Sequence, residues 1–292
     1  MSKREDIKDA SVALSFDYGL IYTKILGWID LGHAQANDAR RLKSILLEEK
    51  GREFFPEYND WYFPVDYFQE MGANKSIFGH TIEFRGGIHS PLMIRSCLSW
   101  KMKQRIALTI MMKTAFRFES FQQFPVFKLR SDSGFSGEDL ISDLVGFYRV
   151  FGEGIDPIIL AQPTSKEYAL WIWDYYGAIG NFKNKEFRPL LFPAPSPHTR
   201  NSPRKGFIPS WLDYIKPLPN LESEHILNRH RNEPSKNFFN DINRINQELY
   251  ISIREKGWNT TNGVRNTNMP ANLHFAPHKP ISVDFFTIDK IF

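Results

Sequence analysis

The chain has 292 residues, and its 37 Lys and Arg against 33 Asp and Glu give a formal net charge of +4. Hydrophobic residues make up 42% of the sequence, which is typical of a folded protein and excludes a disordered chain. A single cysteine, Cys97, excludes an intrachain disulfide and a zinc cluster built on cysteine, so side-chain packing must hold the fold together.

No segment of the sequence has the features of a targeting or membrane-spanning element. The first ten residues, MSKREDIKDA, are charged throughout and lack the apolar stretch of a secretory signal peptide. No apolar run approaches the roughly 20 residues that a membrane span needs. We therefore expect a protein without a transmembrane segment that is made in the cytoplasm, with export only through a specialised secretion system.

The first predicted helix covers residues 31–50. Asp30 is a natural N-cap and Gly51 is a natural C′ residue, and the apolar residues between them recur at near-helical spacing. On such a helix His33 and Asn37 lie about one turn apart on nearly the same face.

The middle of the chain predicts one strand and three further helices. Residues 52–91 are rich in aromatic residues, Gly and Pro, with a short strand at HTIEFRGG. A long apolar helix follows over about 96–122, and its narrow polar face predicts a central position. Another helix starts at Ser136, which is placed to cap it with Asp139 at the capping-box position, and a third covers about 165–179.

The last third of the chain begins with a proline-rich stretch, residues 189–220, which cannot form a helix or a central strand. Its aromatic residues favour an extended arm packed on the surface. Residues 221–256 show helical periodicity on both sides of Pro234, and residues 281–292 alternate as in a terminal strand or docked tail.

Together these elements predict an α+β protein that is mainly α, with central apolar helices and a few short strands. We expect a helical core domain over residues 1–188, the proline-rich arm over 189–220, and a C-terminal helical segment with a terminal strand over 221–292, packed on the core.

The strongest candidate for chemistry is the pair Asp30 and His33 at the start of the first helix. A carboxylate and an imidazole in this arrangement suit two roles, as metal ligands or as a general base with its orienting partner. A structural interpretation stays open beside these roles. In it, Asp30 only caps the helix and His33 makes a buried hydrogen bond.

Glu138, Asp139 and Asp143 form a second candidate group. Acids at a helix N-terminus are stabilised by the helix dipole by roughly 0.3–1 kcal/mol each, which accounts for Glu138 and Asp139 without any function. Asp143 lies one turn further in. If the two helices pack together, Glu138 or Asp143 supplies another carboxylate beside Asp30 and His33, in a catalytic site that also suits a divalent metal such as Zn, Mn or Mg.

Weaker candidates lie outside this constellation. His80 and Glu83, with His89 downstream, have the spacing of some zinc ligands, but positions 80 and 83 of a strand face opposite sides. Cys97 could be a nucleophile with His80 or His89 as its base, although its apolar neighbours favour a plain buried thiol. The motifs of zincins, α/β-hydrolases, P-loop proteins and dinucleotide-binding proteins are absent from the sequence.

Four stretches are informative together: Gly19–Thr23 leading to Gly27–His33, and Gln104–Ala107 leading to Phe135–Leu140. They resemble an uncharacterised bacterial family of unknown function that includes many lipoproteins, over roughly residues 15–150. That family has a His-Glu pair on the helix after the Gln-Arg-Ile-Ala stretch, where this chain has Lys113-Thr114, and the lipobox is missing here. The resemblance implies a bacterial origin and a role related to the cell envelope.

These observations lead to a first hypothesis, an envelope-directed bacterial hydrolase. It would be an antibacterial effector, or toxin, that acts on a cell-wall substrate with His33 as base or metal ligand and Asp30 as its partner. The alternative is a non-catalytic adaptor whose proline-rich arm binds a protein partner. A nucleic-acid binder is disfavoured, because acids and prolines interrupt each basic cluster.

Overall fold

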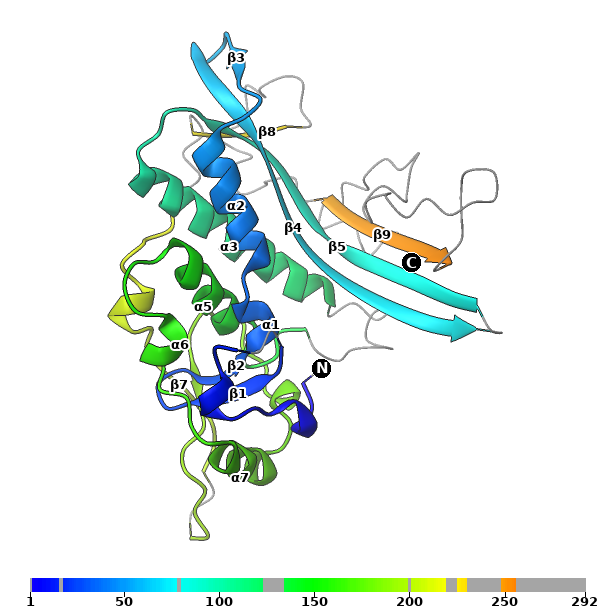
Figure 1. Cartoon of the computed structure of the whole chain (residues 1–292), viewed down its shortest axis with the longest axis vertical. Helices are drawn as coiled ribbons and strands as arrows, with labels where there is room; N and C mark the ends of the chain where they lie inside the picture. Colours follow the sequence, from blue (N-terminus) through cyan, green and yellow to red (C-terminus); the bar gives the residue numbers. More distant parts are fainter. Residues whose placement is uncertain are drawn as a thin grey trace. The chain divides into compact units, whose positions relative to one another are not determined.

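The computed structural model describes residues 2–15, 18–77, 80–122, 134–198, 201–218, 225–229 and 248–255 (Figure 1). The chain forms two compact units. One unit combines Met1–Glu49 with Cys97–Pro219, and the other combines Lys50–Ser96 with Asn220–Phe292. The chain therefore leaves the first unit after its first helices and returns to it to complete the core.

The second unit is built on a long β-hairpin, and for this reason the expected mainly α class is wrong. Strands β4 (Asp60–Ile77) and β5 (His80–Arg95) have 18 and 16 residues and pair antiparallel along their whole length. Near the start of β4 the buried residues Phe63, Val65 and Tyr67 alternate with less buried ones, as in a strand with one covered face. The protein is a mixture of α and β structure.

Three further strands extend this sheet. Strand β3 (Glu53–Phe55) pairs with β4, and strands β8 (Ile226–Asn228) and β9 (Glu248–Glu255) pair antiparallel with β5. The predicted helical segment over 221–256 is thus wrong in both of its described parts. The predicted terminal strand over 281–292 lies outside the described residues.

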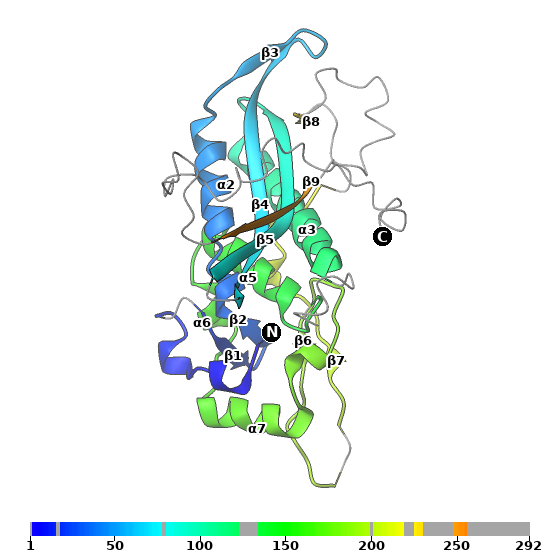
Figure 2. The same cartoon turned by 90° about the vertical axis from the view of Figure 1, so that its right-hand side faces the viewer.

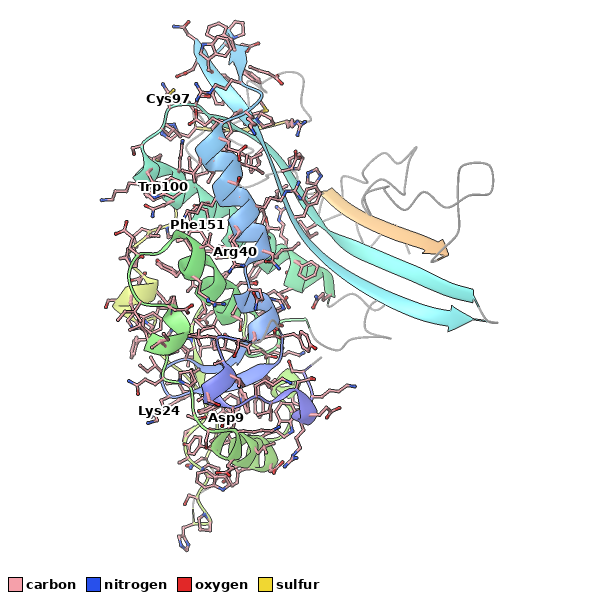
Figure 3. All side chains as sticks on the ribbon, viewed as in Figure 1. Asp9, Lys24, Arg40, Cys97, Trp100 and Phe151 are labelled. Carbon is pink, nitrogen blue, oxygen red and sulfur yellow. The ribbon has the colours of Figure 1, made fainter. Side chains whose placement is uncertain are left out.

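The first unit is organised around helix α5 (Asp139–Phe151). Twelve of its thirteen residues are buried, and it packs against four neighbouring helices, α1 (Leu31–Ala34), α2 (Asn37–Glu48), α3 (Trp100–Gln122) and α6 (Pro157–Leu160). Its last residue, Phe151, stacks on Trp100 at the start of α3, with ring centroids 5.8 Å apart (Figure 3). The described α-helices of this unit are α1, α2, α3, α5, α6 and α7 (Lys166–Tyr176) (Figure 1 and Figure 2).

None of the described helices is both long enough and apolar enough to span a membrane. Four short 3₁₀ helices complete the described helical structure of the first unit: Arg4–Asp6, Ala10–Val12, Ile179–Asn181 and Ser210–Leu212.

The predicted continuous helix over 31–50 is interrupted. Helix α1 is a single turn, and Ala36 then adopts a left-handed conformation with φ 54° before α2 begins. No residue in the sequence signals this break, because alanine has no preference for positive φ. His33 and Asn37 therefore belong to different helices.

A small sheet precedes α1 and sets its position. Strands β1 (Leu20–Thr23) and β2 (Gly27–Asp30) form an antiparallel hairpin, and the short strands β6 (Leu190–Leu191) and β7 (Arg204–Lys205) extend it. Gly27 has φ 73°, and a Cβ there would lie 2.1 Å from the carbonyl oxygen of Leu190. The close pairing of β2 with β6 therefore requires glycine at this position.

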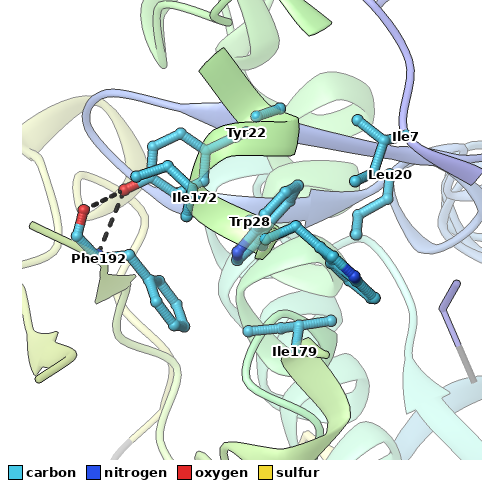
Figure 4. Close-up of a cluster of buried hydrophobic side chains, with 9 residues drawn as sticks. Ile7, Leu20, Tyr22, Trp28, Ile172, Ile179 and Phe192 are labelled. Atoms are coloured by element: carbon cyan, nitrogen blue, oxygen red, sulfur yellow. Dashed lines mark hydrogen bonds between the residues drawn. The ribbon is translucent and has the colours of Figure 1, made fainter. Parts of the chain in front are cut away.

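Aromatic side chains fill the core between this sheet and α7 (Figure 4). The rings of Trp28 and Trp173 meet edge to face with centroids 5.8 Å apart. The Tyr22 hydroxyl donates to the Phe192 carbonyl oxygen at 2.8 Å and accepts from the Phe192 N–H at 3.2 Å. Phe192 belongs to the proline-rich stretch, so this part of the chain packs into the first unit as an extended arm.

Candidate active site

One pocket of about 340 Å³ lies in the first unit, at the junction of β2, α1 and the start of α5. Its wall carries the carboxyl groups of Asp6, Asp30, Glu138 and Asp139 and the imidazole of His33. The residues that line it in the described part of the chain include no Lys or Arg. The charge of the pocket is therefore governed by acids and one histidine.

Asp30 ends β2 and caps α1. Its Oδ1 accepts hydrogen bonds from the backbone N–H of Gly32 at 2.6 Å and of His33 at 3.3 Å, which is the N-cap role predicted from the sequence. The N–H of Asp30 donates to the Ser142 hydroxyl of α5 at 2.9 Å. Asp30 therefore fixes the start of α1 against α5, and with it the position of His33.

His33 forms an ion pair with Asp143, one turn into α5. Its Nδ1 lies 2.9 Å from Oδ1 of Asp143, and 29% of the His33 side chain and 8% of the Asp143 side chain are exposed. Burial lowers the pKa of His33, but the charge of Asp143 and its hydrogen bond to the ring outweigh this effect, with a further contribution from the charge of Asp30, and raise that pKa well above 6.5. At neutral pH His33 is a cation that donates from Nδ1 to Asp143, so it is suited to stabilise negative charge and unsuited to accept a proton.

Glu138 lies immediately before α5 and is 1% exposed. Its Oε1 accepts from the hydroxyl of Ser2 at 3.0 Å, and its Oε2 accepts from the hydroxyl of Ser136. The sequence predicted that Ser136 caps this helix. The prediction is wrong, because the Ser136 hydroxyl is bonded to Glu138 and caps no backbone N–H among the described residues. Burial raises the pKa of Glu138 above 4.5, and this makes its carboxylate a stronger base than an exposed one.

Asp139 is hydrogen-bonded to a second buried carboxyl group, that of Glu119 in α3. An ionised carboxylate can only accept hydrogen bonds, so this contact requires a proton on one of the two groups. Oε2 of Glu119 already accepts from the backbone N–H of Phe135 at 2.7 Å, which favours the ionised form of Glu119. The proton therefore resides on Asp139.

The surroundings of the two carboxyl groups also favour a proton on Asp139. Burial, followed by the charges of Glu119 and Glu138, raises the pKa of Asp139 well above 3.8, although His33 opposes the shift. Burial also raises the pKa of Glu119 above 4.5, and His33 opposes that shift as well. The raised pKa and the contact with Glu119 thus favour the protonated form of Asp139, whose carboxyl group lines the pocket next to Glu138.

The structure brings together all four residues that the sequence singled out as catalytic. Asp30, His33 and Glu138 line the pocket, and Asp143 bonds to His33 from behind. Glu119 was not found from the sequence, because it lies in another helix, 20 residues before Asp139, and belongs to no recognisable motif. The available signal was that Glu119 is the single acidic residue within α3.

The candidates outside the pocket are placed elsewhere. His89 bonds through Nε2 to Oδ1 of Asp66 at 2.8 Å and stacks on Phe68, in the second unit. The side chains of His80 and Glu83 lie outside the described part of the structure. Cys97 is exposed, with φ 61°, so the prediction of a buried thiol is wrong.

The predicted metal site at Asp30 and His33 gains no third ligand. Within the described ranges, no group of three or more His, Cys, Asp or Glu side chains is arranged to hold a metal ion. One oxygen of Asp30 and one nitrogen of His33 are also engaged in the hydrogen bonds given above.

Replacing Gly146 by Ala is expected to lower the free energy of unfolding by about 1–3 kcal/mol, as for other overpacked contacts. An added Cβ would lie 2.8 Å from the backbone oxygen of His33 and 2.9 Å from Cβ of Ala36, so α1 and α5 would have to move apart. Denaturant unfolding measures the loss, and the NMR signals of the His33 ring report the displacement. Unchanged stability and unchanged ring signals would contradict the packing described here.

Raising the pH from about 5 to 8 is expected to lower the unfolding temperature. The pKa values of Glu119, Glu138, Asp139 and His33 are all raised, so the folded protein holds protons that the unfolded chain releases. The stability that these protons supply is complete below the unfolded pKa values and is lost as pH rises through the folded ones. Thermal unfolding at a series of pH values tests this, and an unfolding temperature that rises over this range would contradict it.

The comparisons with known proteins identify no relative. No protein-family model, no curated protein and no solved structure matches this chain.

Proposed function

We propose that this chain is a hydrolase that uses general acid–base catalysis in the pocket, and that it acts on a cell-wall polymer as an antibacterial effector. The acid–base chemistry is supported by the site geometry. The choice of a cell-wall substrate is supported by the sequence resemblance over residues 15–150.

The observation that carries the proposal is the pairing of two adjacent buried carboxyl groups, Glu138 and Asp139, which line one pocket and have different hydrogen-bond surroundings. Asp139 holds a proton through its contact with Glu119, whereas Glu138 accepts hydrogen bonds on both of its oxygens. Pairs of acids whose environments separate their protonation states are a recurring basis of acid–base catalysis. A purely structural role does not require either group to face a pocket.

Each residue then has a defined role in the reaction. Glu138 takes a proton from a water molecule while the water oxygen attacks the electrophilic carbon of the scissile bond. Asp139 gives its proton to the departing group as that bond breaks. His33 stabilises the negative charge that develops during the attack, and Asp143 holds its ring. Exchange with solvent then removes the proton from Glu138 and returns one to Asp139.

This assignment changes the role first expected for His33. Because its pKa is raised, the His33 ring is protonated at neutral pH and cannot accept a proton in the reaction. The base is therefore Glu138. The rate should follow a bell-shaped pH profile. It rises as Glu138 ionises and falls as Asp139 or His33 loses its proton.

The adaptor hypothesis receives less support from the arm. Tyr148 donates to the Ile215 carbonyl oxygen at 3.0 Å, and the Leu218 N–H donates to the Thr109 hydroxyl at 2.8 Å. Ile215 and Leu218 are buried, so this part of the arm is core structure. Its removal should unfold the first unit, and a loss of partner binding on truncation would then carry no information.

The proposal is tested with purified cell-wall sacculi and with a panel of chromogenic esters, amides and glycosides. The wild-type protein should release soluble fragments from sacculi, and mass spectrometry of these fragments identifies the bond that is cleaved. Hydrolysis of a panel compound without release from sacculi would retain the acid–base site and reject the cell-wall substrate. No turnover of either, with a folded protein, would reject the proposed function.

A further inference from the structure

We propose that residues 2–6 form a removable cover over the pocket, and that its closed position blocks Glu138. Two residues of this N-terminal cover, Ser2 and Asp6, line the pocket. The hydroxyl of Ser2 donates to Oε1 of Glu138 at 3.0 Å. It therefore occupies an acceptor position that an incoming water or ligand hydroxyl would use.

The chain directly after the cover is firmly held. Ile7 is fully buried in the aromatic core of the first unit, and the N–H of Lys8 donates to the Leu20 carbonyl oxygen at 2.8 Å. Asp9 accepts from the backbone N–H of Lys166 at 2.8 Å. These contacts hold Ile7 in the core (Figure 4), so it can serve as a fixed point about which the preceding residues swing.

The cover itself has no buried residue. Besides the contact of Ser2 with Glu138, an ion pair anchors it to α7. Nε of Arg4 donates to Oδ1 of Asp174 at 2.7 Å, and Nη2 of Arg4 donates to Oδ2 of Asp174 at 2.8 Å. About half of each side chain in this pair is exposed. Segments held by exposed contacts rather than buried area open readily and locally.

The structure thus combines a fixed hinge, a weakly held segment and a direct contact with the proposed base. This is the arrangement of an autoinhibitory cover that a ligand displaces on entry. Its importance for turnover rests on the proposed function, whereas its effect on access to Glu138 can be measured without any substrate.

The test is carboxyl labelling of the full chain with a water-soluble carbodiimide and glycine ethyl ester, read residue by residue by mass spectrometry. Arg4→Asp should increase the labelling rate of Glu138 by about two- to fivefold, which is the range expected for loss of an exposed ion pair. Asp174→Arg should have a similar effect. The double variant with both changes restores an ion pair of reversed polarity and should return the rate to the wild-type value.

Two controls make the result specific. Lys3→Ala removes a positive charge from the cover without touching the anchor. In the described part of the chain the ion pair of the Lys3 amine is with Glu5, 3.9 Å away, so this variant should leave the labelling of Glu138 unchanged. The exposed carboxyl of Glu153 should be labelled equally in every variant. Equal labelling of Glu138 in Arg4→Asp and wild type, or failure of the double variant to restore the rate, would overturn the cover. If the variants show the expected labelling of Glu138 but the wild-type protein turns over neither sacculi nor any panel compound, the cover stands and only the proposed function is rejected.

Discussion

Asp139→Asn is expected to reduce turnover by a factor of about 100 to 10,000, which is the usual contribution of a positioned general acid or base. An asparagine amide has nearly the same shape as the protonated carboxyl group and can still donate a hydrogen bond to Glu119. It cannot give a proton to a leaving group. The variant should therefore lose catalysis while it keeps its fold. The initial rate on the substrate identified from sacculi or the chromogenic panel gives the measurement.

Glu153→Gln is the matched control for this change. It also replaces a carboxyl by an amide in the same unit, but Glu153 is exposed and does not line the pocket. Its turnover should equal that of the wild type. An Asp139→Asn protein that retains most of its activity would show that Asp139 is not the proton donor. Equal loss in both variants would point to a general effect on the protein.

Glu49→Ala should be the most damaging single change to stability, with a loss of about 3–5 kcal/mol in the free energy of unfolding. The side chain of Glu49 is 4% exposed, and its Oε1 lies 2.6 Å from the amine of Lys103. Both of its carboxylate oxygens also accept from the backbone N–H of Cys97, at 3.1 and 3.2 Å. Removal of the carboxylate takes the ion-pair partner from the largely buried amine of Lys103, which also donates to the Leu46 carbonyl oxygen at 2.9 Å, and takes an acceptor from the Cys97 N–H.

The position of this contact in the chain adds to its effect. Glu49 and Cys97 are the residues at which the chain leaves and re-enters the first unit, so their hydrogen bonds tie the two crossings together. A double variant, Glu49→Gln with Lys103→Met, keeps an acceptor for Cys97 and removes the unpaired charge. Denaturant unfolding should show recovery of much of the lost stability. If Glu49→Ala unfolds at the wild-type denaturant concentration, the buried pair is not what holds this junction.

The sequence predicted local features that depend on neighbouring residues. The N-cap role of Asp30 is present, and so is a helix that starts after Ser165, whose hydroxyl accepts from the Tyr168 N–H. Capping depends on residues within one turn, so a single sequence contains the necessary information. The break at Ala36 was not predicted. Ala36 packs closely against Gly146 of α5, a contact distant in the sequence that local patterns do not reveal.

Strand β9 shows why the predicted fold class failed. Leu249 and Ile253 are four residues apart, a spacing that fits one face of a helix and also alternate positions of a strand. Ile251 between them fits only the strand, and Ile253 indeed pairs with Phe84 of β5. The partner strand lies more than 150 residues earlier, so the sheet that decides between the two patterns was not visible in the local sequence.

The candidate site was predictable only in part, for a similar reason. Asp30, His33, Glu138 and Asp143 come from two short segments with recognisable acids and a histidine, and packing of α1 on α5 brings them together. In the sequence, the position of Asp139 at a helix start already explained its presence, so its raised pKa was not foreseen. The raised pKa depends on Glu119, a residue of α3 that only the folded chain places beside Asp139.

The most direct measurement is the ¹³C NMR titration of the Asp139 side-chain carboxyl group in protein labelled at aspartate, with Asp139→Asn to assign the signal. The account predicts a protonated carboxyl at neutral pH, an apparent pKa for the Asp139–Glu119 pair well above the ordinary 3.8 of an aspartate, and a clear fall in that pKa in Glu119→Gln. A signal that is already ionised below pH 5, or one that does not respond to Glu119→Gln, would contradict it.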